Sequence, residues 1–97
     1  MKIVENENKI VLKFNSFKSL IIDKNSRKIK YWDGQVDFDD IIGYWKNYHP
    51  GGKLFVYYIM LLTRKKIHKI TPELEDEELI DKILEILKST IPREVKE

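Results

Sequence analysis

Few side chains in this chain could perform catalysis or bind a metal ion. Cysteine is absent, which excludes thiolate catalysis, disulfides and every cysteine-based metal site. The only histidines are His49 and His68, so a zinc site would need carboxylates to complete its four ligands. The serines have no nearby histidine to activate them, and no phosphate-binding glycine loop occurs. These features predict that the chain is not an enzyme.

Four aspartates, Asp33, Asp37, Asp39 and Asp40, lie close together and could attract a cation. Their spacing does not match that of a calcium-binding loop, in which the ligands alternate around a central glycine. They fit a turn followed by the outward face of a strand. We expect them to be solvated carboxylates, and we predict no metal site.

His49 begins the tetrapeptide His-Pro-Gly-Gly, which resembles the haem-ligating loop of some small b-type cytochromes. That resemblance implies a second axial histidine from a neighbouring helix pair. Here only His68 is available, and the sequence between the two histidines is strand-like. Haem binding is therefore the most remote alternative, and no cofactor is predicted. The favoured interpretation is a hairpin turn preceded by an extended His49, because a following proline disfavours helical backbone.

Basic residues interleaved with an aromatic form the first candidate binding surface. In "KNSRKIKYW" the alternation places Lys28, Lys30 and Trp32 on one strand face. Such a face can hold the phosphate of a lipid headgroup or of a nucleic acid. The alternative is an ordinary solvated sheet face. With a second basic run further along the chain, the phosphate-binding candidates are Lys24, Arg27, Lys28, Lys30, Arg64, Lys65 and Lys66.

Aromatic crowding marks a second candidate surface, since nine of the eleven aromatic residues fall between Tyr31 and Tyr58. Aromatic side chains that stay exposed are typical of protein interfaces. The candidates for such an interface are Trp32, Trp45, Tyr48 and Tyr57. Two alternatives are that these side chains fill a small core, or that the apolar segment Leu54–Leu62 forms a homodimer.

Apolar residues recur with a period of two from about residue 2 to residue 70, which predicts strands. Turn residues in "ENEN", "DKNS" and "DG" separate the first strands. The segment "DDIIGYWKNYH" fits either a strand or a helix, and we favour a strand. After Pro50-Gly51-Gly52, "KLFVYYIMLLT" is apolar on both faces, which is typical of a central strand. Arg64–Lys66 then turns the chain into "IHKI".

The period changes after residue 70. Thr71, Pro72 and Glu73 form an expected helix start, with an N-cap, a proline in the first turn and an early acid. An apolar stripe at helical spacing follows, so we predict an amphipathic helix over about residues 72–90 and a frayed tail over 93–97. The stripe consists of Ile80, Ile83, Leu84, Leu87 and Ile91, and the first four are expected to be buried.

The order of these elements resembles the PH-like domains. The resemblance rests on "SLIIDKNSRKIKYW…VDFDDII" followed by "KLFVYYIMLLTRKKIHKI…ELIDKILEIL". It implies a mainly β (α+β) fold, in which a bent antiparallel sheet or split barrel of six to seven strands carries one C-terminal helix. A length of 97 residues suits a single domain over residues 1–97.

The net charge of +2 is unevenly distributed, because residues 1–70 hold 14 basic and 7 acidic side chains whereas residues 71–97 hold 4 and 9. With no secretory signal visible, we expect a cytoplasmic protein, with peripheral membrane attachment as an alternative. Abundant lysine and glutamate, with one glutamine and no cysteine, are typical of hyperthermophiles, so we expect the source to be a thermophilic archaeon or one of its viruses. We predict a non-catalytic interaction module that binds a protein partner or an anionic membrane surface. The alternative function is binding of nucleic acid.

Overall fold

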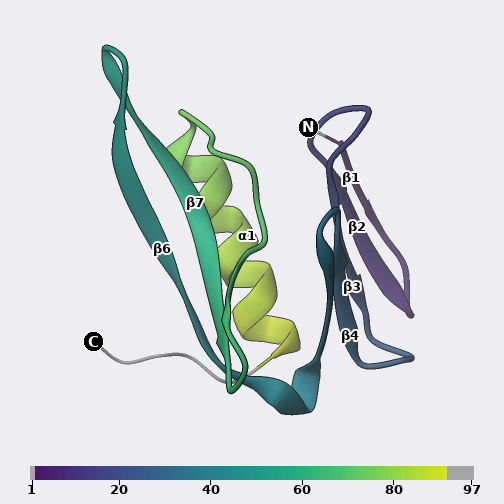
Figure 1. Ribbon diagram of the computed structural model, residues 1–97. Coiled ribbons are helices and arrows are strands. Elements are labelled where there is room, and N and C mark those ends of the chain that lie inside the picture. The colour runs from purple at the N-terminus through teal and green to yellow at the C-terminus, as the bar shows by residue number, and fades with distance from the viewer. Residues whose placement is uncertain (1, 92–97) are drawn as a thin grey trace. The chain divides into compact units, whose positions relative to one another are not determined.

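The computed structural model describes residues 2–91, which form eight strands, one short 3-10 helix and one α-helix (Figure 1). The predicted mainly β class with a C-terminal helix is confirmed. The strands number eight rather than six or seven, and they form two antiparallel sheets, neither of which closes into a barrel. The chain divides into two compact units between Asp40 and Ile41, here called the N-terminal and C-terminal units.

The N-terminal unit is a five-stranded sheet in which every strand pairs with its neighbour in the sequence. The strands are β1 (Lys2–Glu5), β2 (Lys9–Lys13), β3 (Ser19–Asp23), β4 (Lys28–Tyr31) and β5 (Gly34–Asp37), followed by the 3-10 helix η1 (Phe38–Asp40). The "ENEN", "DKNS" and "DG" segments all form the connections expected of them.

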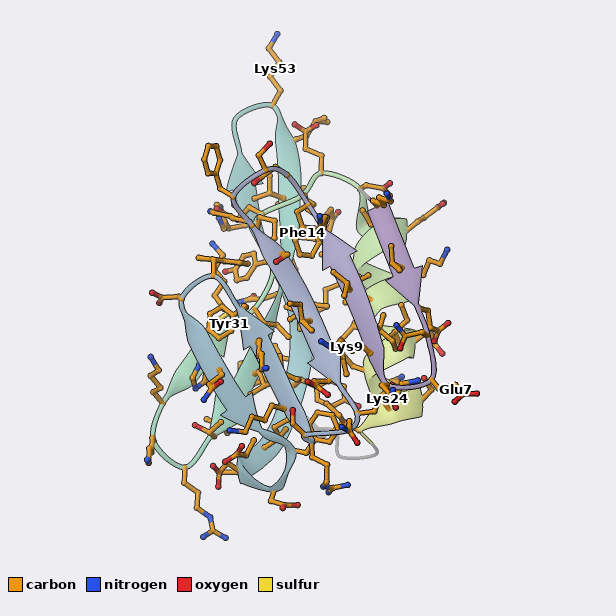
Figure 2. All side chains as sticks on the ribbon, turned by 90° about the vertical axis from the view of Figure 1, so that its right-hand side faces the viewer. Glu7, Lys9, Phe14, Lys24, Tyr31 and Lys53 are labelled. Carbon is orange, nitrogen blue, oxygen red and sulfur yellow. The ribbon has the colours of Figure 1, made fainter. Side chains whose placement is uncertain are left out.

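Register explains which face of this sheet is apolar. Ile10, Ile22, Ile29 and Val36 lie opposite one another across four strands, and all four are buried. The alternating positions carry mainly charged side chains on the other face (Figure 2). The period of two in the sequence therefore corresponds to a sheet with one buried face.

The C-terminal unit contains the second sheet, with strand order β6-β7-β8. Its strands are β6 (Ile41–Gly51), β7 (Leu54–Thr63) and β8 (Ile67–Lys69). The segment that fitted either a strand or a helix is thus a strand, which begins directly after η1. At the hairpin tip Gly52 has φ of +87°, a backbone conformation that L side chains rarely adopt.

The helix α1 (Glu77–Thr90) begins later than predicted, and the assignment of Thr71 as its N-cap is wrong. The N-cap is Asp76, whose Oδ1 accepts a hydrogen bond from the backbone N–H of Leu79 at 3.2 Å. The Thr71 hydroxyl is buried and instead accepts from the N–H of Ile59 at 3.0 Å. Leu74 then pairs with Tyr57 as an isolated bridge, which holds the intervening segment extended along β7.

The helix α1 packs on β6 and β7 (Figure 1). Ile80, Ile83 and Leu87 are buried, as predicted from their spacing. Leu84, which was also expected to be buried, lies at the margin of the stripe and is only half-buried. At the far end of the helix, the hydroxyl of the buried Tyr44 donates to the backbone carbonyl of Ile91 at 2.7 Å. This bond fixes the helix end against β6.

Candidate interaction surfaces

The β6–β7 hairpin is longer than the helix that covers it. Ten residues of β7 extend over about 33 Å, whereas the fourteen residues of α1 extend over about 21 Å. The first turns of α1 lie beside Lys46, and its end meets Tyr44. The same hairpin face therefore continues past the start of the helix toward the tip.

Aromatic side chains occupy this uncovered part of the hairpin. Tyr48 and Tyr57 lie opposite each other, and Phe55 follows on the same face. The Tyr48 ring is 5.7 Å from the Phe55 ring and 6.2 Å from the Tyr57 ring. Tyr48 is 61% exposed and Phe55 50%. We call Tyr48, Phe55 and Tyr57 the hairpin surface.

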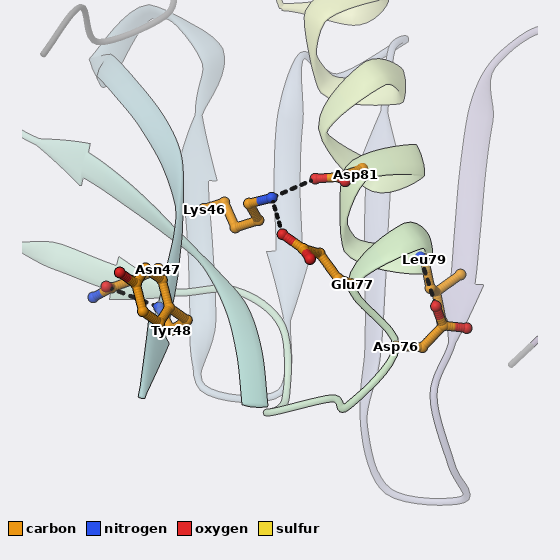
Figure 3. Close-up of polar contacts among 7 residues, drawn as sticks. All are labelled: Lys46, Asn47, Tyr48, Asp76, Glu77, Leu79 and Asp81. Atoms are coloured by element: carbon orange, nitrogen blue, oxygen red, sulfur yellow. Dashed lines mark hydrogen bonds and ion pairs between the residues drawn. The ribbon is translucent and has the colours of Figure 1, made fainter. Parts of the chain in front are cut away.

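Lys46 stands between the hairpin surface and the helix. Its Nζ donates to Glu77 Oε2 at 2.6 Å and to Asp81 Oδ1 at 2.9 Å (Figure 3). Hydrogen bonding to Glu77, and next to Asp81, raises the pKa of the Lys46 ammonium. The same Nζ lies 5.9 Å from the centre of the Tyr57 ring. Two carboxylates surround this one cation, so Lys46 is not a free positive charge, and the cluster of three side chains carries a net charge of −1.

His49 lies on β6 in extended conformation, as its position before proline predicted. Its Nε2 contacts Glu73 Oε1, and its Nδ1 lies 2.9 Å from the carbonyl oxygen of Pro50. The Pro50 carbonyl, followed by Glu73, raises the pKa of His49, while His49 lowers the pKa of Glu73. Lys69 approaches the other Glu73 oxygen at 3.3 Å. This arrangement is an ion-pair network that links β6, β8 and the segment before α1.

Within residues 2–91, no group of three or more histidine, aspartate or glutamate side chains could hold a metal ion. The acidic run near residue 40 is instead divided among ion pairs. Asp37 lies 3.7 Å from Lys28, and Asp39 lies 3.1 Å from Arg27. In the same described part of the chain, no helix is long and apolar enough to cross a membrane.

The four aromatic interface candidates do not form one surface. Tyr48 and Tyr57 come together on the hairpin surface. Trp45 lies on the opposite face of β6, where it is half-buried opposite Met60. Trp32 belongs to the N-terminal unit, and it is not on a strand face with Lys28 and Lys30 as expected. Strand β4 ends at Tyr31, and Trp32 begins the turn into β5.

The basic candidates are also divided. Lys28 and Lys30 share the charged face of the five-stranded sheet, but each has an aspartate beside it, with 3.8 Å between Lys30 Nζ and Asp23 Oδ2. Hydrogen bonds from backbone N–H groups, chiefly that of Ser26, lower the pKa of Asp23 and keep it anionic. Lys24 and Arg27 lie in the β3–β4 turn. Arg64, Lys65 and Lys66 form the exposed β7–β8 turn of the other unit.

The most exposed aromatic of the described chain was absent from the sequence-based candidates. Phe17 is 90% exposed in the turn between β2 and β3. Leu54 and Phe55 were considered only as part of a strand that could dimerise. An available signal for Phe17 was its position between Asn15-Ser16 and Lys18, where an apolar residue interrupts a polar turn.

Comparisons with known proteins identify no relative. No protein-family model, no curated protein and no solved structure matches this chain.

Proposed function

We propose that the chain is a non-catalytic interaction module whose hairpin surface binds an apolar patch on a protein partner. The observation that carries this proposal is the continuation of the helix-covered hairpin face into exposed Tyr48 and Phe55. Rigid aromatic side chains bury a large area on binding and lose little conformational freedom. Lys46 at the edge is already paired with Glu77 and Asp81, so it is not a free cation that a partner would have to neutralise.

The proposal is tested by site-specific photo-crosslinking. A photoreactive phenylalanine analogue placed at Tyr48 should capture one polypeptide from an extract of the source organism, and the same analogue at Phe17 should not. The captured polypeptide, once purified, should bind the unmodified chain. Tyr48→Ala with Phe55→Ala should weaken that binding at least tenfold, because truncating buried aromatic anchors is costly. Equal binding by the variant and the wild type would refute the proposal.

Self-association is a distinct outcome of the same experiment. If the crosslinked product is a dimer of this chain, sedimentation should show a concentration-dependent dimer that Phe55→Ala dissociates. That result would assign the hairpin surface to a homodimer and would refute a separate partner.

Nucleic-acid binding is the rival function, and the salt response separates the two. Affinity for nucleic acid falls steeply with salt in proportion to the phosphates neutralised, whereas an aromatic protein interface responds weakly. The aspartates beside Lys28 and Lys30 favour the protein interface, because they compensate charge that phosphate contacts would need. Kinship with the PH-like domains stays a hypothesis that would fit an interaction module.

A further inference from the structure

The five-stranded sheet has two unlike ends. Antiparallel register brings Lys2, Lys13 and Ser19 to the same end as the β4–β5 turn. At this end, the turns expose Phe17 and Trp32. The opposite end holds the "ENEN" and "DKNS" turns. Figure 2 shows the two ends, with Phe14 near the first and Lys9 and Lys24 toward the second.

Phe17 is exposed because its turn holds it there. Asn15 Oδ1 accepts hydrogen bonds from the N–H groups of Phe17 and Lys18, both at 2.8 Å. The N–H of Phe14 donates to the carbonyl of Lys18 at 3.0 Å and closes the turn. These bonds fix the backbone on both sides of a side chain that is 90% exposed. Phe17 is the most exposed large hydrophobic side chain of the described chain, so it is free to enter an apolar phase.

Trp32 and three lysines lie at the same end of the five-stranded sheet as Phe17. Trp32 is 37% exposed, its ring meets that of Tyr31 edge-on at 5.5 Å, and Lys18 Nζ lies 5.0 Å from its centre. Lys2 and Lys13 are exposed and lie opposite each other on β1 and β2. We call Phe17, Trp32, Lys2, Lys13 and Lys18 the turn surface.

The charge of the turn surface is not compensated as it is elsewhere on the same sheet. Within residues 2–91, none of its three lysines forms an ion pair, whereas Lys28 and Lys30 each lie beside an aspartate. The one acid in its two turns is Asp33, next to Trp32. The turn surface therefore combines an apolar tip, an amphipathic indole and free cations.

We propose that the turn surface docks onto an anionic phospholipid surface. Phe17 would enter the acyl boundary, Trp32 would lie at the headgroup level, and the lysines would attract the anionic headgroups. Charge complementarity selects this occupant: an apolar protein patch would not require three free cations, and an exposed phenylalanine at the tip fits the acyl boundary. This site is separate from the hairpin surface, so it does not depend on the proposed function.

The test uses the full chain with Trp45→Phe, which leaves Trp32 as the only tryptophan. Vesicles of phosphatidylcholine with phosphatidylserine should sediment the protein and shift the Trp32 emission to the blue, and vesicles of phosphatidylcholine alone should do neither. Phe17→Ala should lower the vesicle affinity about tenfold or more, as expected for an apolar side chain that leaves the bilayer. Ile67→Ala is the control, because it removes an exposed apolar side chain of the other unit that belongs to neither surface, and it should change nothing.

Charge reversal tests the second half of the proposal. Lys13→Glu with Lys18→Glu should lower the affinity for the anionic vesicles by roughly 25-fold or more, from roughly fivefold for each lysine lost. Raised salt should also lower the affinity of the wild type for the anionic vesicles, because salt screens the lysine charges. Equal loss with Ile67→Ala, or unchanged binding with Phe17→Ala, would overturn the proposal. An absence of vesicle binding would also overturn the proposal. If the protein instead bound a single-stranded oligonucleotide, and the charge reversal abolished that binding, the surface would be assigned to nucleic acid.

Discussion

The hairpin surface and the turn surface both expose phenylalanine, but they are positioned by different kinds of contact. The hairpin surface depends on residues far away in the sequence: the helix beneath the hairpin, the Thr71 to Leu74 segment along β7, and Lys46 bonded to α1. Phe17 on the turn surface is instead held by its immediate neighbours, in a turn closed by Asn15. Distant substitutions should therefore disturb the hairpin surface, whereas only local ones should disturb the turn that presents Phe17.

Of the substitutions that test this comparison, Leu87→Ala should have the largest effect on the free energy of unfolding. Leu87 is fully buried on the helix stripe, so its truncation should lower the free energy of unfolding by about 2–5 kcal/mol. Leu84→Ala is the matched control on the same helix, and it should cost clearly less because Leu84 is half-buried. Denaturant unfolding followed by circular dichroism measures both. Equal costs would contradict the placement of the stripe.

Thr71→Val tests the segment that precedes the helix. It should cost about 1–3 kcal/mol, because the buried N–H of Ile59 loses its acceptor. Thr71→Ser keeps the hydroxyl and should recover much of the loss. Asp76→Ala should cost about 1 kcal/mol through the helix cap. If Thr71→Val were neutral and only Asp76→Ala destabilised the protein, the hydroxyl contact to β7 would carry no stability.

Asn15→Ala tests the local side of the comparison. It removes the acceptor of two exposed backbone bonds, so the free energy of unfolding should change by no more than about 1 kcal/mol. Amide hydrogen exchange at Phe17 and Lys18, followed by NMR, should become at least severalfold faster. Exchange in β7 should stay unchanged. Faster exchange in both units would show that the turn is not a local structure.

The smallest effect should be the pH dependence of the His49–Glu73 pair. The folded pKa of His49 lies above its ordinary 6.5, so its contribution is present below that pH and is lost as the pH rises through the raised value. The folded pKa of Glu73 lies below its ordinary 4.5, so its contribution is present above that pH and is lost as the pH falls through the lowered value. The stabilisation is therefore greatest between these two pH values.

His49→Gln measures this window. The difference in melting temperature between the wild type and the variant should be largest between pH 4.5 and 6.5, and it should shrink at alkaline pH. NMR titration should give a raised pKa for His49 that Glu73→Gln returns toward the ordinary value. A pKa at or below the ordinary value in the wild type would contradict the pairing.

The strands and turns of this fold could be predicted from the sequence because alternation is a local pattern. Each hairpin signal lies within a few residues of the strands that it joins. The "PGG" turn is displaced, because Pro50 and Gly51 still pair within β6 and the chain reverses at Gly52 and Lys53. The helix start could not be predicted in the same way. Thr71 and Asp76 are both good N-caps by residue type, and the choice depends on a bond from Thr71 to Ile59 across twelve residues.

The candidate surfaces were harder to predict than the fold. Lys28 and Lys30 resemble a phosphate-binding face in the sequence, but register places Asp37 and Asp23 beside them. Tyr48 and Tyr57 were identified as aromatic residues, but their exposure depends on where the helix begins. Phe17 was missed because exposure of a turn residue is a tertiary property that periodicity does not encode.

The strictly sequential pairing of strands has a consequence for how the chain is made. Each strand finds its partner in the segment synthesised just before or just after it, so folding of both sheets needs few long loop closures and should be fast. The exception is the helix, which is translated after the hairpin that it covers. Until α1 emerges from the ribosome, Tyr44, Ile59 and Leu61 lack their apolar cover. A nascent chain that pauses there would be the form most prone to aggregate, and the best substrate for a chaperone.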